Sequence, residues 1–130
     1  MARGVIQGIL ALPFSRRQAQ LAKERAPLSE DEFATRISEA EGDREAAVIV
    51  YRKLSEWIYA KQFTPYPDDS LGRLYGIAEE ELDEDLILEA FDTLAVVPPG
   101  EERLKAFGPV DTPLQVAKLI ALARNEVGLR

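Results

Sequence analysis

The chain has 130 residues and a formal net charge of -7, and it contains neither cysteine nor histidine. This length suits a single domain whose core needs no disulfide or metal ion. The missing residue types exclude disulfides, thiolate metal ligands, cysteine nucleophiles and histidine bases, and with them most familiar catalytic and metal sites. No apolar run approaches the roughly 20 residues of a membrane-spanning helix.

The N-terminal segment, residues 1–27, is expected to form a short helical arm. Apolar residues recur at helical spacing over residues 5–12, and Pro13 is expected to limit that helix. Because no small-x-small cleavage site follows, we expect this segment to belong to a cytoplasmic protein rather than to act as a signal peptide. The arm either packs on the protein's own core or stays mobile, or it binds a partner or a membrane surface through basic side chains. These basic side chains are Arg3, Arg16 and Arg17.

The remainder, residues 28–130, is expected to form one helical bundle. Ser29 followed by Glu32 fits a capping box and predicts a helix from Glu30 to about Glu39. Asp43 is a good N-cap for a second, longer helix of about five turns. Its apolar stripe comprises Ala47, Val50, Tyr51, Leu54, Trp57, Ile58 and, at its end, Lys61.

A strongly acidic helix is predicted over residues 78–95, after one helical turn that Ser70 begins and Gly76 closes. Residues 66–102 contain twelve acidic residues and one basic residue, a net charge of -11. This charge repels a nucleic-acid backbone and favours either a basic protein partner or solubility alone. The side of the helix expected to be buried comprises Leu82, Leu86, Leu88, Phe91 and Leu94.

Two further helical segments are predicted near the C-terminus. After the loop of residues 96–100, residues 101–107 are expected to form one or two turns. Thr112 as N-cap and Pro113 at the first helical position then begin a closing helix. No strand alternation is present, so we predict an all-α protein, a small bundle of four to five helices with an N-terminal helical arm.

Residues 44–123 resemble the acyl carrier protein fold. The resemblance depends on the sequence segments Asp68-Asp69-Ser70-Leu71, Gly76-Ile77, Leu82 to Leu94, Val96-Val97-Pro98 and Val110-Asp111-Thr112. It implies a phosphopantetheine group on a serine that begins the acidic helix. That position falls near Ala78-Glu79-Glu80, where no hydroxyl exists. The Asp-Ser-Leu sequence at Ser70 lies earlier, where a serine is typical of a turn or an N-cap.

We therefore expect a non-catalytic helical domain that docks on an unidentified basic protein and requires no cofactor or metal. One alternative is a divergent acyl or peptidyl carrier domain with phosphopantetheine on Ser70. Another is a membrane-surface adaptor that uses the arm. The docking residues expected on the acidic helix are Glu79, Glu80, Asp83, Glu84 and Asp92.

Overall fold

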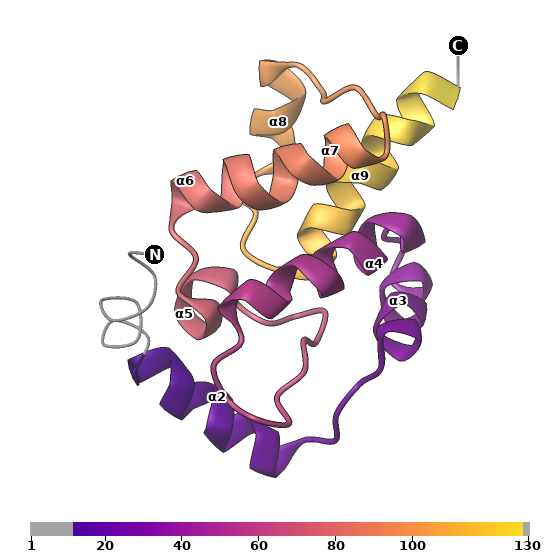
Figure 1. The fold of residues 1–130 in the computed structure, drawn as a ribbon. Helices are drawn as coiled ribbons and strands as arrows, with labels where there is room; N and C mark the ends of the chain where they lie inside the picture. Colours follow the sequence, from indigo (N-terminus) through magenta and orange to yellow (C-terminus); the bar gives the residue numbers. More distant parts are fainter. Residues whose placement is uncertain (1–11, 129–130) are drawn as a thin grey trace.

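The computed structural model describes residues 12–128, and every regular element in this range is a helix (Figure 1). This confirms the predicted all-α class. The elements are α2 (Leu12–Glu24), α3 (Glu30–Glu39), α4 (Arg44–Lys53) with its 3₁₀ extension η1 (Leu54–Trp57), α5 (Leu71–Tyr75), α6 (Glu79–Glu81), the π-helical segment η2 (Leu82–Leu88), α7 (Glu89–Thr93), α8 (Glu101–Phe107) and α9 (Pro113–Gly128).

The helix α4 is the centre of the bundle, because α3, α7 and α9 all contact it. Its side chains enter two neighbouring apolar clusters. The first cluster surrounds Phe33 and Ile120, and the second surrounds Leu54 and Trp57. Leu54 is fully buried and Trp57 is 3% exposed, so the predicted apolar stripe does face the core.

Local capping interactions begin three of the helices where the sequence predicts. The Ser29 hydroxyl accepts from the Glu32 N–H at 3.1 Å, while the Glu32 carboxylate accepts from the Ser29 N–H at 3.0 Å. The Asp43 carboxylate accepts from the Ala46 N–H at 2.9 Å. Thr112 accepts from the backbone of Gln115 at 3.1 Å, and the Gln115 side chain accepts from the Thr112 N–H at 3.0 Å. These bonds satisfy donors that a helix N-terminus leaves unpaired.

The helix that Asp43 begins, predicted to run for about five turns as far as Lys61, ends at Trp57 instead. The reason is Gln18 of α2, whose buried side-chain amide donates to the Trp57 carbonyl at 2.9 Å and accepts from the Tyr59 N–H at 2.8 Å. These bonds occupy backbone groups that a continued helix would have paired internally. The residue after η1, Ile58, is accordingly extended, with φ -96° and ψ 120°.

The acidic helix is continuous over residues 79–93, but its central part is π-helical. Leu82 and Phe91 are nine residues apart, about two and a half α-helical turns, which would place them on opposite faces. A π turn, with i→i+5 bonds, holds more residues and brings both side chains to the buried face. Leu88 is 50% exposed and Leu94 is only half-buried. The prediction that Leu88 lies on the buried side was therefore wrong.

The helix α2 packs on α5, so that residues far apart in sequence lie side by side (Figure 1). Gly76 closes α5 with a φ of 72°, a conformation that favours glycine. A Cβ atom on Gly76 would lie 2.6 Å from the Phe14 ring, which shows how closely α2 approaches. Pro13 lies in the first turn of α2 and does not limit that helix. The predicted helix of residues 5–12 lies, apart from residue 12, outside the described residues.

Candidate functional site

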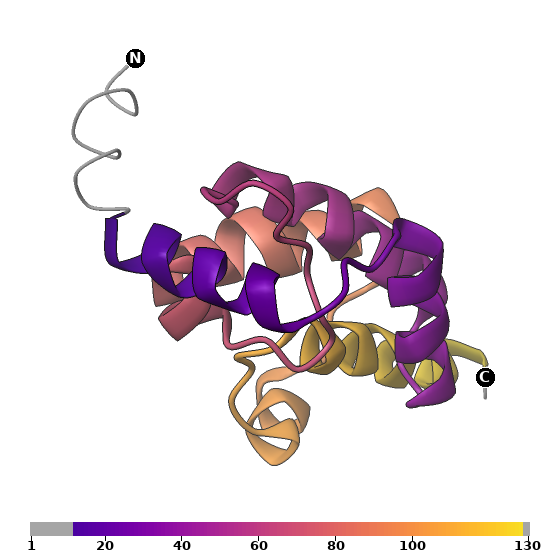
Figure 2. The ribbon, with the colours of Figure 1, turned by 90° about the horizontal axis from the view of Figure 1, so that it is seen from below.

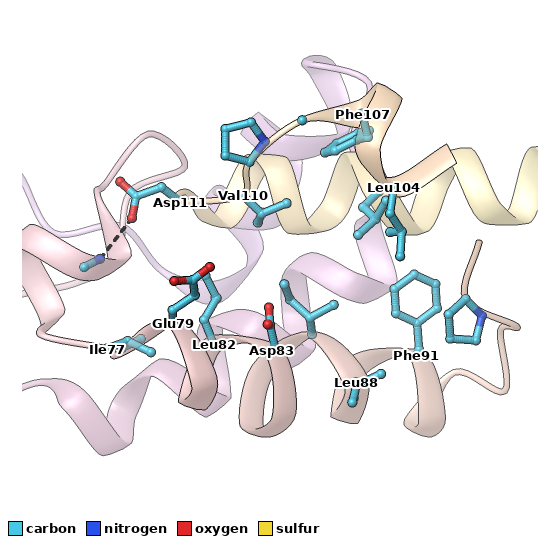
Figure 3. A pocket seen from close by; sticks show the side chains of 16 residues that line it. Ile77, Glu79, Leu82, Asp83, Leu88, Phe91, Leu104, Phe107, Val110 and Asp111 are labelled. Carbon is cyan, nitrogen blue, oxygen red and sulfur yellow. Dashed lines mark hydrogen bonds between the residues drawn. The ribbon is translucent and has the colours of Figure 1, made fainter. Parts of the chain in front are cut away.

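A groove with a volume of about 640 Å³ lies between the acidic helix (residues 79–93) and the segment that comprises α8 and residues 108–111 (Figure 3). We call it the apolar groove, because eleven of its sixteen lining residues are apolar. These eleven are Ile77, Leu82, Ile87, Leu88, Phe91, Pro98, Leu104, Phe107, Pro109, Val110 and Leu119. Its volume falls within the range of about 300–1,000 Å³ typical of ligand sites.

The groove exposes apolar side chains that have no cover within the described chain. Leu88 is 50% exposed and Leu104 is 39% exposed, and these two account for half of the exposed large apolar residues between positions 12 and 125. In Figure 3, Leu104 and Phe107 face the acidic helix across the groove. Paired exposed apolar side chains on two facing elements are typical of a binding surface, whereas single ones need no explanation.

The groove stays open because α8 stands away from the bundle. None of the residues in α8 is buried, and Figure 2 shows the helix projecting at the lower edge of the molecule. The chain leaves α8 through Gly108, whose φ of 92° favours glycine, and Pro109 follows. This turn returns the chain towards α9 and leaves a gap between α8 and the acidic helix.

Three carboxylates border the groove, and none of the described residues that line it is basic. Glu79 and Asp83 come from the acidic helix, and Asp111 lies across from them (Figure 3). The Asp111 carboxylate is fixed, since it accepts from the Gly72 N–H at 3.0 Å and from the Ser70 hydroxyl at 2.6 Å. The border is therefore anionic, and one of its charges is held in a defined position.

The five predicted docking residues are all exposed, but they do not share one surface. Glu79 and Asp83 line the apolar groove. Glu84 and Asp92 line an adjoining hollow of about 510 Å³, which shares Leu88, Phe91 and Pro98 with the groove. Glu80 lines neither surface.

Sequence reasoning missed the second wall of the groove. It treated Leu104 and Phe107 only as part of a short helix, and it placed Leu88 in the core. A signal for this wall was present, because Pro98, Pro99, Gly108 and Pro109 separate α8 from its neighbours.

Ser70 serves as the N-cap of α5. Its hydroxyl accepts from the Arg73 N–H at 3.1 Å and donates to Asp111 at 2.6 Å. A phosphodiester on this oxygen would remove the hydrogen bond that Ser70 donates to Asp111. Engagement of the hydroxyl as cap and as donor therefore disfavours a phosphopantetheine attachment at Ser70.

Between residues 12 and 128, no group of three or more acidic side chains is gathered in a way that could hold a metal ion. In the same range, no helix is both long enough and apolar enough to cross a membrane. No protein-family model, no curated protein and no solved structure matches this chain. The resemblance to acyl carrier proteins therefore stays a prediction.

Proposed function

We propose that the protein is a non-catalytic interaction domain that binds a basic, amphipathic segment of a partner protein in the apolar groove. The observation that carries this proposal is the combination of apolar walls with a border of three carboxylates and, among the described lining residues, no basic side chain. Apolar anchors would enter the groove, and flanking lysine or arginine side chains would meet Glu79, Asp83 and Asp111. This division between an apolar centre and a polar rim is common to protein interfaces.

An amphipathic helix is the form of partner that fits this groove best. One wall is formed by residues 79–93 and the other by α8, so the groove lies between helices. A bound helix presents apolar residues at i, i+3, i+4 and i+7 to such a groove. Addition of an extended strand is not supported, because residues 12–128 include no strand whose edge a peptide could extend.

The charge of the surrounding surface favours the same class of partner. Residues 66–102 have a net charge of -11, and most of this charge is on the acidic helix. A potential of this sign attracts basic segments over a distance and raises their association rate, most strongly at low ionic strength. Binding should therefore weaken as salt is added, because exposed charges are screened over about 8 Å at physiological ionic strength.

The proposal can be tested with a synthetic probe peptide on the full-length protein. The probe has leucine at the a and d positions of a heptad and lysine elsewhere, and a scrambled peptide of the same composition lacks the apolar face. We expect saturable binding of the first peptide by fluorescence anisotropy and binding at least about tenfold weaker for the scrambled one. Equal affinity for the two peptides would mean that charge alone attracts them and would contradict a groove.

Two matched pairs of variants locate the binding surface. Glu79→Lys/Asp83→Lys changes the groove border, whereas Glu80→Lys/Asp85→Lys makes the same charge change on exposed residues of the same helix that line no groove. Only the first pair should weaken binding about tenfold.

The second comparison concerns the apolar wall. Leu104→Ser removes an exposed side chain of the groove, and Leu12→Ser removes one that is 53% exposed on α2. Only Leu104→Ser should weaken binding, since both substitutions at exposed positions leave folding almost unchanged. Equal effects within either comparison would overturn the proposal.

A further inference from the structure

A second hollow, of about 920 Å³, lies between α2 and the segment from Asp68 to Leu74. Three exposed arginine side chains line it. Arg16 and Arg17 come from α2, and Arg73 comes from α5, which lies beside α2 in Figure 1. None of these three residues belongs to the apolar groove.

The hollow carries an excess of positive charge although the whole protein has a net charge of -7. Its lining also includes Arg25, Asp68 and Asp69. Arg25 and Asp69 neutralise each other through an ion pair of 2.8 Å, so that among the described lining residues one acid, Asp68, stands against three arginines. Arg73 is the only basic residue among positions 66–102, and the fold places it beside the two arginines of α2.

Like charges gathered in one hollow repel one another, and a bound anion would relieve this repulsion. Among the described residues, Arg16, Arg17 and Arg73 form no ion pair with an acidic side chain. Arg17 is nevertheless held in place, since its guanidinium donates to the backbone carbonyl of Arg73 at 2.7 Å. It also lies 5.7 Å from the centre of the Phe14 ring.

We propose that this hollow binds a phosphate group through the guanidinium groups of Arg16, Arg17 and Arg73. Guanidinium groups donate pairs of parallel hydrogen bonds to phosphate and to carboxylate. A carboxylate has one charge and two oxygens, which one arginine satisfies. A phosphate monoester has nearly two charges and three terminal oxygens, which match several arginines. The phosphate belongs either to a soluble molecule or to a lipid headgroup.

The first experiment titrates the full-length protein with inorganic phosphate and with pyrophosphate, at an ionic strength kept constant with chloride. Nuclear magnetic resonance of backbone and arginine N–H groups should show saturable shifts around Arg16, Arg17 and residues 70–74. Arg16→Gln/Arg73→Gln should weaken binding of both probes at least about tenfold. The variant keeps Arg17 and the backbone carbonyl that holds it.

A control variant, Arg44→Gln/Arg52→Gln, removes the same charge from α4, where each arginine has an exposed ion pair with an acid of α3. It should bind phosphate as the wild type does. Shifts that do not saturate, or equal losses in both variants, would show only a general attraction of anions and would overturn the proposal.

The second experiment distinguishes the two sources of phosphate by co-sedimentation with phosphatidylcholine vesicles that contain phosphatidic acid, a monoester, or phosphatidylglycerol, a diester. Saturable binding of free phosphate without a preference for phosphatidic acid indicates a soluble ligand. A preference for phosphatidic acid that Arg16→Gln/Arg73→Gln removes indicates a lipid headgroup. Equal binding to both vesicles, together with no saturable binding of free phosphate, would overturn the site.

Discussion

The guanidinium of Arg25 forms two parallel hydrogen bonds, of 2.8 and 2.9 Å, with the carboxylate of Asp69, 44 positions later in the chain. The same carboxylate accepts from the Tyr66 N–H at 2.9 Å and from the Tyr75 hydroxyl at 2.8 Å. Arg25 also lies 4.0 Å from the centre of the Tyr66 ring. This cluster joins the end of α2 to the loop before α5, and it satisfies a carboxylate that is almost fully buried.

Arg25→Met should lower the free energy of unfolding by about 3 kcal/mol, because it leaves the Asp69 carboxylate buried without its cation. Chemical denaturation measures the change. Arg44→Met is the control, since the Arg44–Asp31 pair is exposed, at 46% and 85%, and such pairs contribute less than about 1 kcal/mol. Equal destabilisation by the two substitutions would show that the buried pair has no special role.

Gln18→Leu should lower the free energy of unfolding by about 3 kcal/mol, because the Gln18 amide is the partner of three backbone groups in the core. It donates to the carbonyls of Trp57 and Leu74 and accepts from the Tyr59 N–H. Gln20→Leu is a matched control on the same helix, since Gln20 is exposed and its side chain, among the described residues, bonds to Glu24 on the surface. Comparable melting temperatures for the two variants would contradict this role of Gln18.

The features of the fold that sequence reasoning predicted correctly are local. The caps at Ser29, Asp43 and Thr112 each depend on the residue three positions later, and the apolar stripe around Leu54 follows from helical periodicity. The early end of that helix was missed, because the responsible residue, Gln18, is 39 positions from Trp57. The sequence around Gln18 is polar, and it does not indicate that tertiary packing will bury this side chain.

The candidate site was predictable only on its charged side. The acids of residues 79–92 are evident in the sequence, whereas the apolar wall depends on where α8 lies and on the π turns that expose Leu88. A 3.6-residue periodicity cannot reveal a change of periodicity within the helix. The hollow lined by Arg16, Arg17 and Arg73 could not be predicted either, because Arg17 and Arg73 are 56 positions apart in the sequence.

The stability advantage that Tyr75 provides over phenylalanine should disappear at high pH. Burial raises the pKa of Tyr75, and the adjacent Asp69 carboxylate raises it further. Above about pH 10 the unfolded chain loses a phenol proton that the folded protein retains, so the free energy of unfolding falls as pH rises. Below this pH the phenol keeps its proton in both states, and Tyr75 makes its full contribution to the free energy of unfolding.

Wild type should therefore exceed Tyr75→Phe by about 1 kcal/mol near neutral pH, through the hydrogen bond to Asp69. The difference should shrink by up to roughly 1.4 kcal/mol per pH unit above pH 10. Urea denaturation of both proteins across this range provides the measurement. A constant difference would mean that the phenol titrates alike in both states.

Ser70→Ala and Asp111→Asn should destabilise the protein through the same lost interaction, the 2.6 Å hydrogen bond between the two side chains. A double-mutant cycle should give a coupling energy of about 1 kcal/mol. Ser70→Ala with Asp31→Asn is the control cycle, since Asp31 accepts from Arg44 and shares no hydrogen-bond partner with Ser70, so its coupling energy should be near zero. A coupling near zero for Ser70 and Asp111 would contradict the structural role of the serine.

The Ser70 hydroxyl, engaged as donor to Asp111 and as N-cap acceptor, is not presented for modification, so the intact mass of the protein should be that of the unmodified chain. Co-expression with a phosphopantetheinyl transferase should leave the mass of the full-length chain unchanged, while a genuine acyl carrier protein in the same cells is converted. The Ser70→Ala variant identifies the attachment point if a change occurs. A mass increase that this variant abolishes would show that Ser70 carries the prosthetic group, and the protein would then be a carrier domain rather than a binding domain alone.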